Sequence, residues 1–127
     1  MKTVLLVEND GDTRDIYATA LRHSGFDVLL AKDGGEGIRI AREHGPDLIL
    51  MNLAMPKVDG LSATSLLRDD PRTAGIPIVA CTGFSYHDGA ERAEDAGADA
   101  YLDKPVEPSR VVEEVMRMIG PAVPAGD

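Results

Sequence analysis

The sequence is poor in features that would place the protein in a membrane or in an oxidising compartment. It contains a single cysteine, Cys81, which cannot form an internal disulfide and therefore suits a reducing cytosol. No apolar stretch approaches the length needed to cross a bilayer, and no segment resembles a secretory signal. We therefore expect a soluble, cytoplasmic protein that does not associate with membranes.

Basic residues are also scarce. The chain has 13 Lys and Arg against 22 Asp and Glu, which gives a formal net charge of −9, and it has no basic cluster. Because phosphate contacts need clustered Lys and Arg, we expect no direct binding to nucleic acid. Motifs of common enzyme sites are missing as well: there is no glycine-rich phosphate loop, no nucleophile elbow and no Cys–His pairing.

The sequence does contain a regular alternation of two patterns. Its 127 residues, 43% of them hydrophobic, suit one globular domain. Short apolar runs, typical of strands buried on both faces of a parallel sheet, alternate with stretches of helical periodicity. The alternation predicts an α/β fold over residues 1–120, a (βα)5 doubly wound parallel sheet with helices on both faces. Residues 121–127 are predicted to form a flexible C-terminal tail. The predicted strands are residues 3–7, 26–30, 47–51, 76–81 and 99–102.

The predicted helices differ in the apolar side chains that they can bury. The first helix is expected to bury Ile16, Ala20 and Leu21. The third is expected to bury Leu61, Leu66 and Leu67. The fourth helix, expected to begin within residues 85–88, has only alanines for its buried side. Because alanines bury little apolar area, we expect it to be the least firmly held helix.

Polar residues end four of the five predicted strands. Glu8 and Asn9 follow the first strand, Asn52 ends the third, Thr82 follows the fourth and Lys104 follows the fifth. In a doubly wound sheet, ligand chemistry gathers at the carboxyl ends of the strands. An acid, a hydroxyl, a lysine and a third-strand residue at four strand ends form the layout of a phosphoryl-accepting carboxylate site. The third-strand residue should be the nucleophile, and in this chain it is an amide.

Four segments resemble the receiver domain of bacterial two-component response regulators, of which the single-domain chemotaxis regulator is the simplest member. They are Val4–Glu8, Pro46–Met51, the turn Met55-Pro56-x-x-Asp59-Gly60, and Lys104-Pro105. Each segment alone is a weak signal, but together in this order they are specific, and the resemblance covers residues 3 to about 119. It implies the flavodoxin-like receiver fold with strand order 2-1-3-4-5, and a signalling role in a phosphorelay rather than an enzyme.

The resemblance also implies a role for each residue of the site. In the family, an Asp at the end of the third strand accepts the phosphoryl group, and Mg²⁺ is held by two acids and a backbone carbonyl. The matching residues here are Asn52 for the phosphoacceptor, Glu8 and Asn9 for the acidic pair, Ala54 for the carbonyl, Thr82 and Tyr101 for the switch, and Lys104 for the phosphate contact. Two of these seven positions have lost a carboxylate.

The loss of both carboxylates predicts a site without its usual chemistry. Carboxylate oxygens carry the charge that attack on phosphorus requires, whereas an amide oxygen is neutral. Proteins hold Mg²⁺ mainly through carboxylates, and only Glu8 remains to face Lys104. We therefore expect no phosphoryl transfer onto Asn52. We expect no cofactor, and at most weak Mg²⁺ binding at a degraded site of Glu8, Asn9, Asn52 and Ala54.

Some of these residues also fit ordinary structural roles. Asn9 suits a turn or a helix cap as well as it suits a degraded site. Thr82 is a residue type common in strands, and Tyr101 is expected to be a half-buried core aromatic before it is a switch.

Three functions stay open at this stage. The first is an atypical receiver that acts without phosphorylation through a protein partner (a histidine kinase, a phosphotransfer protein or a downstream effector), as a monomer or weak dimer. The second is a normal phospho-accepting receiver that carries an introduced Asp→Asn change at position 52. Asn9 favours the first, because an introduced change would rarely affect both positions. The third and weakest is a small α/β enzyme or ligand-binding domain.

Overall fold

The computed structural model describes residues 1–55, 59–82 and 89–123, and for Thr82 it describes the backbone but not the side chain. Within these ranges, five strands alternate with five helices. The strands are β1 (Thr3–Val7), β2 (Asp27–Ala31), β3 (Leu48–Asn52), β4 (Ile78–Thr82) and β5 (Ala100–Asp103). The helices are α1 (Gly11–His23), α2 (Gly34–His44), α3 (Gly60–Asp69), α4 (Gly89–Ala96) and α5 (Pro108–Ile119).

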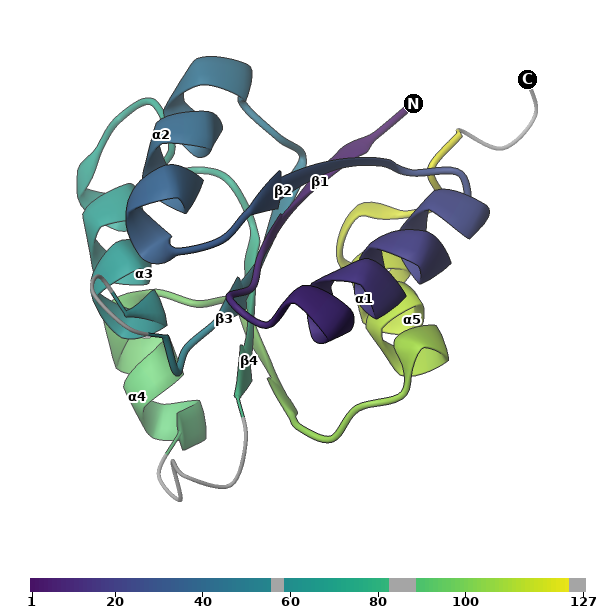
Figure 1. Cartoon of the computed structure of the whole chain (residues 1–127). Helices are drawn as coiled ribbons and strands as arrows, with labels where there is room; N and C mark the ends of the chain where they lie inside the picture. Colours follow the sequence, from purple (N-terminus) through teal and green to yellow (C-terminus); the bar gives the residue numbers. More distant parts are fainter. Residues whose placement is uncertain (56–58, 83–88, 124–127) are drawn as a thin grey trace.

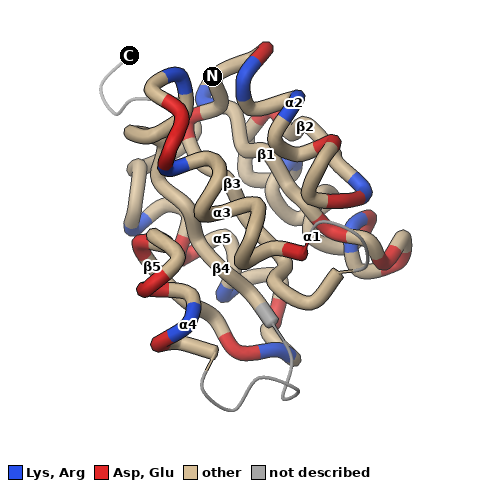
Figure 2. Tube along the Cα trace, turned by 90° about the vertical axis from the view of Figure 1, so that its left-hand side faces the viewer, with Lys and Arg blue, Asp and Glu red and all other residues tan. Residues whose placement is uncertain are grey.

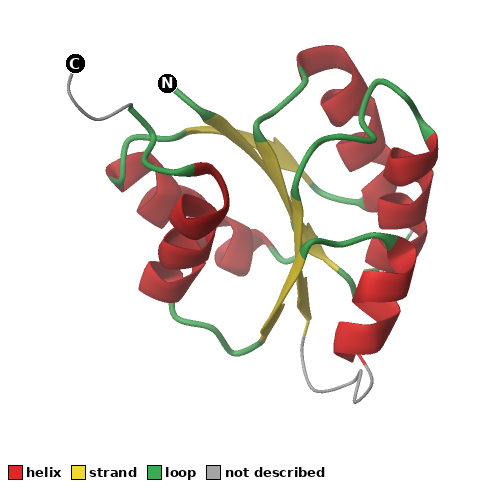
Figure 3. Cartoon of the chain, turned by 180° about the vertical axis from the view of Figure 1, so that it is seen from behind, coloured by secondary structure: helices red, strands yellow, loops and turns green. Residues whose placement is uncertain are grey.

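The strands form one parallel sheet in the order β2-β1-β3-β4-β5, which confirms the predicted fold class and strand order. Helices α1 and α5 cover one face of the sheet, and α2, α3 and α4 cover the other (Figures 1 and 3). Because β1 lies between β2 and β3, the strand order reverses at β1. The carboxyl ends of β1 and β3 therefore lie at the switch point, where doubly wound sheets place their ligand sites.

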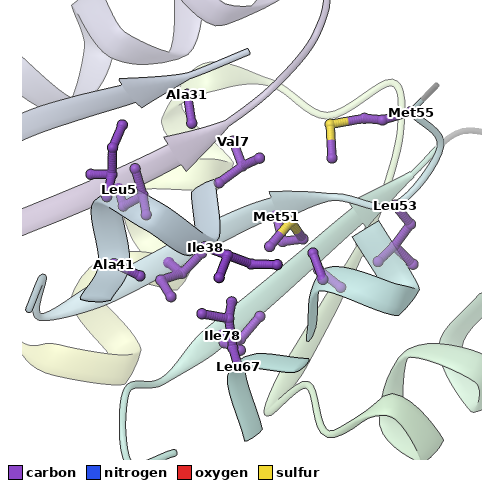
Figure 4. Packing of buried hydrophobic residues seen from close by; sticks show 14 of the residues in the cluster. Leu5, Val7, Ala31, Ile38, Ala41, Met51, Leu53, Met55, Leu67 and Ile78 are labelled. Atoms are coloured by element: carbon purple, nitrogen blue, oxygen red, sulfur yellow. The ribbon is translucent and has the colours of Figure 1, made fainter. Parts of the chain in front are cut away.

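Two apolar clusters, one on each face of the sheet, form the core. Alternate residues of β1 serve both: Leu5 and Val7 belong to the cluster under α2 and α3, whereas Val4 and Leu6 belong to the cluster under α1 and α5. Figure 4 shows the first cluster, with Met51 of β3 packed among side chains from the sheet and from α2 and α3. Burial on both faces explains why the central strands are continuous apolar runs.

Two helices bury only some of the side chains predicted for them. Ile16 is 53% exposed and Leu66 is 47% exposed, so both predictions were wrong. The buried residues of α1 are Tyr17, Ala18 and Leu21, and those of α3 are Gly60, Ala63, Thr64 and Leu67. Polar atoms on these buried faces are satisfied locally: the Thr64 hydroxyl donates to Gly60 O at 2.7 Å, and the Tyr17 hydroxyl donates to Val106 O at 3.1 Å. The predictions for Leu21 and Leu67 were confirmed, so the apolar residues indicate the buried side of each helix but not how far it extends.

Helix α4 buries little, as its sequence predicts. Its buried residues are Gly89 and Ala93, and its predicted start within residues 85–88 lies outside the described residues. Residues 121–123, the described part of the predicted tail, are instead attached to the domain. Ala122 is 3% exposed, and its carbonyl accepts a hydrogen bond from Lys2 N at 3.0 Å. In the described ranges, no helix combines the length and the apolar character that a membrane span requires.

Candidate functional site

The first side of the site is the loop that leads from β1 into α1. Glu8 is 2% exposed, and its backbone is fixed by a hydrogen bond from its N–H to Ala31 O at 3.0 Å. The Arg14 guanidinium of α1 donates to Glu8 O at 2.8 Å. Arg14 was not anticipated from the sequence, because an arginine one turn into a helix gives no sign of reaching back to the preceding strand.

Asp10, the other acid in this loop, caps α1. Its carboxylate accepts hydrogen bonds from Thr13 N at 2.9 Å and from the Thr13 hydroxyl at 2.6 Å. The hydroxyl and the backbone N–H of Thr13 hold the pKa of the Asp10 carboxyl below its ordinary value, with smaller contributions from Lys104 and Arg14. Such a cap stabilises the start of a helix. One oxygen of the Asp10 carboxylate is therefore engaged in capping the start of α1.

The second side of the site is the end of β3, where the start of α3 comes very close. Asn52 is 7% exposed, and Leu53 O accepts a hydrogen bond from Gly60 N at 3.0 Å. A Cβ atom on Gly60 would lie 2.2 Å from Asn52 O. Glycine is therefore needed at position 60 for the backbone to approach, which is the physical reason for the Asp59-Gly60 pair in the sequence.

The Asn52 side chain joins the two sides. Its amide nitrogen Nδ2 lies 2.9 Å from Glu8 Oε2, 2.9 Å from Asn9 Oδ1 and 3.3 Å from Ala54 O. Its amide oxygen Oδ1 accepts a longer hydrogen bond from Ala54 N at 3.4 Å. All four predicted members of the degraded metal site are thus brought together around one amide group.

The partners determine which way the Asn52 amide faces. The Glu8 carboxylate and the Ala54 carbonyl can only accept hydrogen bonds, so the atom between them must be a donor. With Oδ1 in that place, oxygens would face one another with no proton between them. The amide nitrogen has two protons, so the short contacts to Glu8 and Asn9 take one each and Ala54 O shares one of them.

Lys104 completes the site from the end of β5. Its ammonium group donates to Glu8 Oε1, which is the pairing that the sequence predicted. The Lys104 side chain is 20% exposed and the Glu8 side chain is 2% exposed, so the pair is largely out of water. The two charges balance, and among the described residues that contact the Asn52 amide no second carboxylate is present.

The two predicted switch residues lie differently. Thr82 ends β4 opposite Asp103 of β5, and its side chain falls outside the described part of the structure. Tyr101 is half-buried and packs against the cluster under α2 and α3. Its buried hydroxyl has no hydrogen-bond partner among the described residues, and burial, reinforced by Asp103, raises the pKa of Tyr101 to about 12. The switch roles stay predictions.

The oxygens of the site do not fit Mg²⁺. This cation requires near-octahedral oxygen ligands and is held in proteins chiefly by carboxylates. The site has one carboxylate, Glu8, and one of its oxygens already pairs with Lys104. The other converges with Asn9 Oδ1 and Ala54 O on the Asn52 amide nitrogen. Over residues 1–55, 59–82 and 89–123, no group of three or more His, Cys, Asp or Glu side chains is arranged to hold a metal.

Comparison with known proteins agrees with this geometry. The sequence profile of the family "Response regulator receiver domain" matches residues 4–116. The polar-differentiation response regulator DivK of Brucella anthropi is 35% identical over 121 residues, which cover 95% of this chain and 98% of DivK.

Solved structures from several organisms are similar in fold, among them two bacterial proteins. The receiver domain of a sensor histidine kinase from Pseudomonas aeruginosa, whose crystal structure has a magnesium ion coordinated in the active-site cleft, is 32% identical with a TM-score of 0.86. The match covers 94% of this chain and 98% of that one. The chemotaxis protein CheY4 of Vibrio cholerae has a TM-score of 0.87 at 24% identity, over 94% of this chain and 99% of its own, and shows the fold alone.

Proposed function

Because this chain belongs to the family of response regulator receiver domains, we propose that it acts in two-component signalling without aspartyl phosphorylation, by binding a protein partner. Receiver domains are signalling domains that interact with proteins such as histidine kinases and effectors. The specific part of the proposal is that this chain does so with no phosphoryl group on residue 52. Its partner is then a protein of the same kind of pathway: a kinase, a phosphotransfer protein or an effector.

One observation carries this proposal: an amide stands at the phosphoacceptor position, with its nitrogen held by Glu8 and Asn9. The oxygen that would have to attack phosphorus is neutral, and Ala54 N donates to it. Phosphoryl transfer also relies on metal ions to neutralise charge on the transferred group. The Pseudomonas aeruginosa relative coordinates magnesium in its cleft, whereas the oxygens of this chain are directed at the Asn52 amide.

The hydrogen bond between Asn52 and Asn9 favours the atypical receiver over a single introduced change. The two positions that lost a carboxylate contact each other at 2.9 Å, one as donor and one as acceptor. An Asp at position 9 would accept from Asn52 equally well, but it would place a second negative charge beside Glu8, which already pairs with Lys104. The two amides therefore form a matched pair in a neutral site.

We place the partner on the side formed by α4, β5 and α5. A hollow of about 540 Å³ lies between α4 and β5, with Ala90, Ala93 and Glu94 on one side and Tyr101 on the other. Helix α4 buries only Gly89 and Ala93 along its length, so few contacts fix its position. A partner that binds this side can select one position of α4, in place of selection by a phosphoryl group.

The direct test is incubation with acetyl phosphate or phosphoramidate and Mg²⁺, followed by intact mass measurement. We expect no phosphoryl adduct on the wild-type protein. The positive control is the variant Asn9→Asp/Asn52→Asp, which restores both carboxylates and should be modified faster than Asn52→Asp alone. A stoichiometric, base-labile adduct on the wild type would overturn the proposal. An inert double variant would show that Thr82 and Lys104 are not placed for this chemistry.

A further inference from the structure

The contacts of the Asn52 amide nitrogen are unusual for a side-chain amide. Three oxygens from three separate residues point at this one atom at 2.9, 2.9 and 3.3 Å. They are a carboxylate, a side-chain amide oxygen and a backbone carbonyl. Glu8 is 2% exposed, and Ala54 lies two residues beyond the end of β3. Oxygens gathered in this way repel each other unless something positive lies between them.

We propose that the Asn52 amide nitrogen is a built-in replacement for a divalent cation, which makes the stability of this domain independent of metal. The amide protons carry partial positive charge to each of the oxygens that would otherwise require a cation. The chain supplies this charge from its own β3, so it is present whenever the domain is folded. The Glu8–Lys104 ion pair supplies the remaining balance.

The proposal predicts a specific consequence for an aspartate at position 52. Aspartate has nearly the shape of asparagine, but it would replace the donor with an oxygen 2.9 Å from Glu8 Oε2 and from Asn9 Oδ1. Lys104 would then face two carboxylates alone. The site would have to take up a cation to relieve the repulsion, and Asn52→Asp would therefore make stability depend on metal.

This inference rests on the proposed function only in treating the site as free of phosphoryl chemistry, and the two can fail separately. Phosphoryl transfer is read by mass, whereas the role of the amide is read by stability. A phosphorylated wild type would overturn the proposed function and leave the stability result to stand. A wild type whose stability depends on metal, but which forms no phosphoryl adduct, would overturn this inference and leave the proposed function to stand.

The test is thermal unfolding of wild type, Asn52→Asp and Asn52→Ala. Each protein is measured in EDTA and in about 10 mM MgCl₂, a concentration high enough to detect Mg²⁺ binding at a site with few carboxylates. We expect the Tm of wild type to be the same in both buffers. In EDTA at pH 8, Asn52→Asp should lose roughly 5 °C or more, and Mg²⁺ should restore most of that loss.

Asn52→Ala is the matched control, because it removes the donor without adding a charge. It should lose stability at every pH and gain nothing from Mg²⁺. The proposal would be overturned if Asn52→Asp were as stable as wild type in EDTA at pH 8. It would also be overturned if Mg²⁺ raised the Tm of wild type as much as that of Asn52→Asp. An Asn52→Ala variant that Mg²⁺ rescues would overturn it as well.

Discussion

At the scale of single residues, the site is governed by the cost of burying charge. Glu8 is charged and 2% exposed, and the described structure offers it one cation, Lys104, at Oε1 and two donors, Asn52 Nδ2 and Asp10 N, at Oε2. A buried ion pair adds little net stability by itself, because desolvation offsets the attraction. Removal of one partner is a different matter, since it leaves the other charge buried and uncompensated.

Lys104→Met should therefore destabilise the domain. We expect the free energy of unfolding to fall by roughly 2 to 4 kcal/mol, at the lower end because Lys104 is partly exposed. Urea denaturation measures this, with Lys32→Met as the control: Lys32 is exposed, and its substitution should change stability by no more than about 0.5 kcal/mol.

The double variant Glu8→Gln/Lys104→Met removes both charges and should recover much of the loss. If the double variant is less stable than Lys104→Met, the buried charge of Glu8 is not the cause.

The sequence could predict this part of the site, but it could not predict how its backbone is held. Glu8, Asn52 and Lys104 were expected to meet because each ends a strand of one parallel sheet. The contact from Arg14 to Glu8 O and the close approach of Gly60 to Asn52 O depend on the paths of the connecting segments. Side-chain reach and backbone proximity between separate segments leave no periodic signal in a sequence.

At the scale of elements, one arginine connects three of them. Arg68, near the end of α3, lies with its side chain 20% exposed. Its guanidinium donates to Gly97 O at 2.7 Å, Ala74 O at 3.0 Å, Ile76 O at 2.6 Å and Asp99 Oδ2 at 2.6 Å. Asp99 in turn accepts from the backbone N–H of Ile78, the first residue of β4. Arg68 thereby ties the end of α4 and the start of β4 to α3.

Arg68→Ala should loosen this junction. It removes the Arg68 donor from three carbonyl groups and from the Asp99 carboxylate, which keeps its bond from Ile78 N, so we expect a loss of roughly 2 to 3 kcal/mol in the free energy of unfolding. Hydrogen exchange should rise at the end of α4 near Gly97. Arg39→Ala is the control, since Arg39 forms an exposed pair with Glu43 within α2 and should contribute less than about 1 kcal/mol. Equal effects of the two variants would show that Arg68 is only a surface residue.

The sequence predicted the positions of the strands well and the buried sides of the helices less well. All five strands were predicted within two residues, because runs buried on both faces are continuous and short. The buried sides of α1 and α3 were predicted only in part: Leu21 and Leu67 are buried as expected. Tyr17 and Thr64 were missed, since they bury polar groups that are satisfied inside the fold. Apolar character alone could not show that Ile16 and Leu66 point outwards.

At the scale of the whole molecule, the two layers differ in how firmly they hold their helices. Helix α5 packs a broad apolar side against the sheet, with Val111 and Val115 fully buried, whereas α4 contributes only Gly89 and Ala93. Figure 2 shows acidic and basic residues spread over the molecule, which carries a net charge of −9. The proposed partner side is therefore set by the loosely packed α4 rather than by a patch of one charge.

Two variants that each add one negative charge test this side. Ala90→Glu fills the hollow between α4 and β5, and Thr19→Glu changes an exposed position of α1 on the opposite face of the sheet. We expect Ala90→Glu to weaken binding to a co-purified and identified partner at least about tenfold, a change of about 1.4 kcal/mol, while Thr19→Glu leaves it nearly unchanged.

Binding should also be the same with and without a phosphodonor. Hydrogen exchange of the complex locates the contact directly. Protection confined to α1 and α2, or equal weakening by both variants, would place the partner on another side.

Because the chain has a single thiol, opening of the structure near the site can be followed by alkylation, without an engineered cysteine. Cys81 is 2% exposed and pairs directly with Asn52 in the register of β3 and β4. Burial raises the pKa of Cys81 to about 12, so the folded protein keeps it as an unreactive thiol near neutral pH. The Cys81 side chain belongs to the apolar cluster under α1 and α5. Any alkylation of this protein must then pass through an opening of that cluster, on the strand next to Asn52. The rate of alkylation therefore measures that opening, either in the unmodified protein or inside cells.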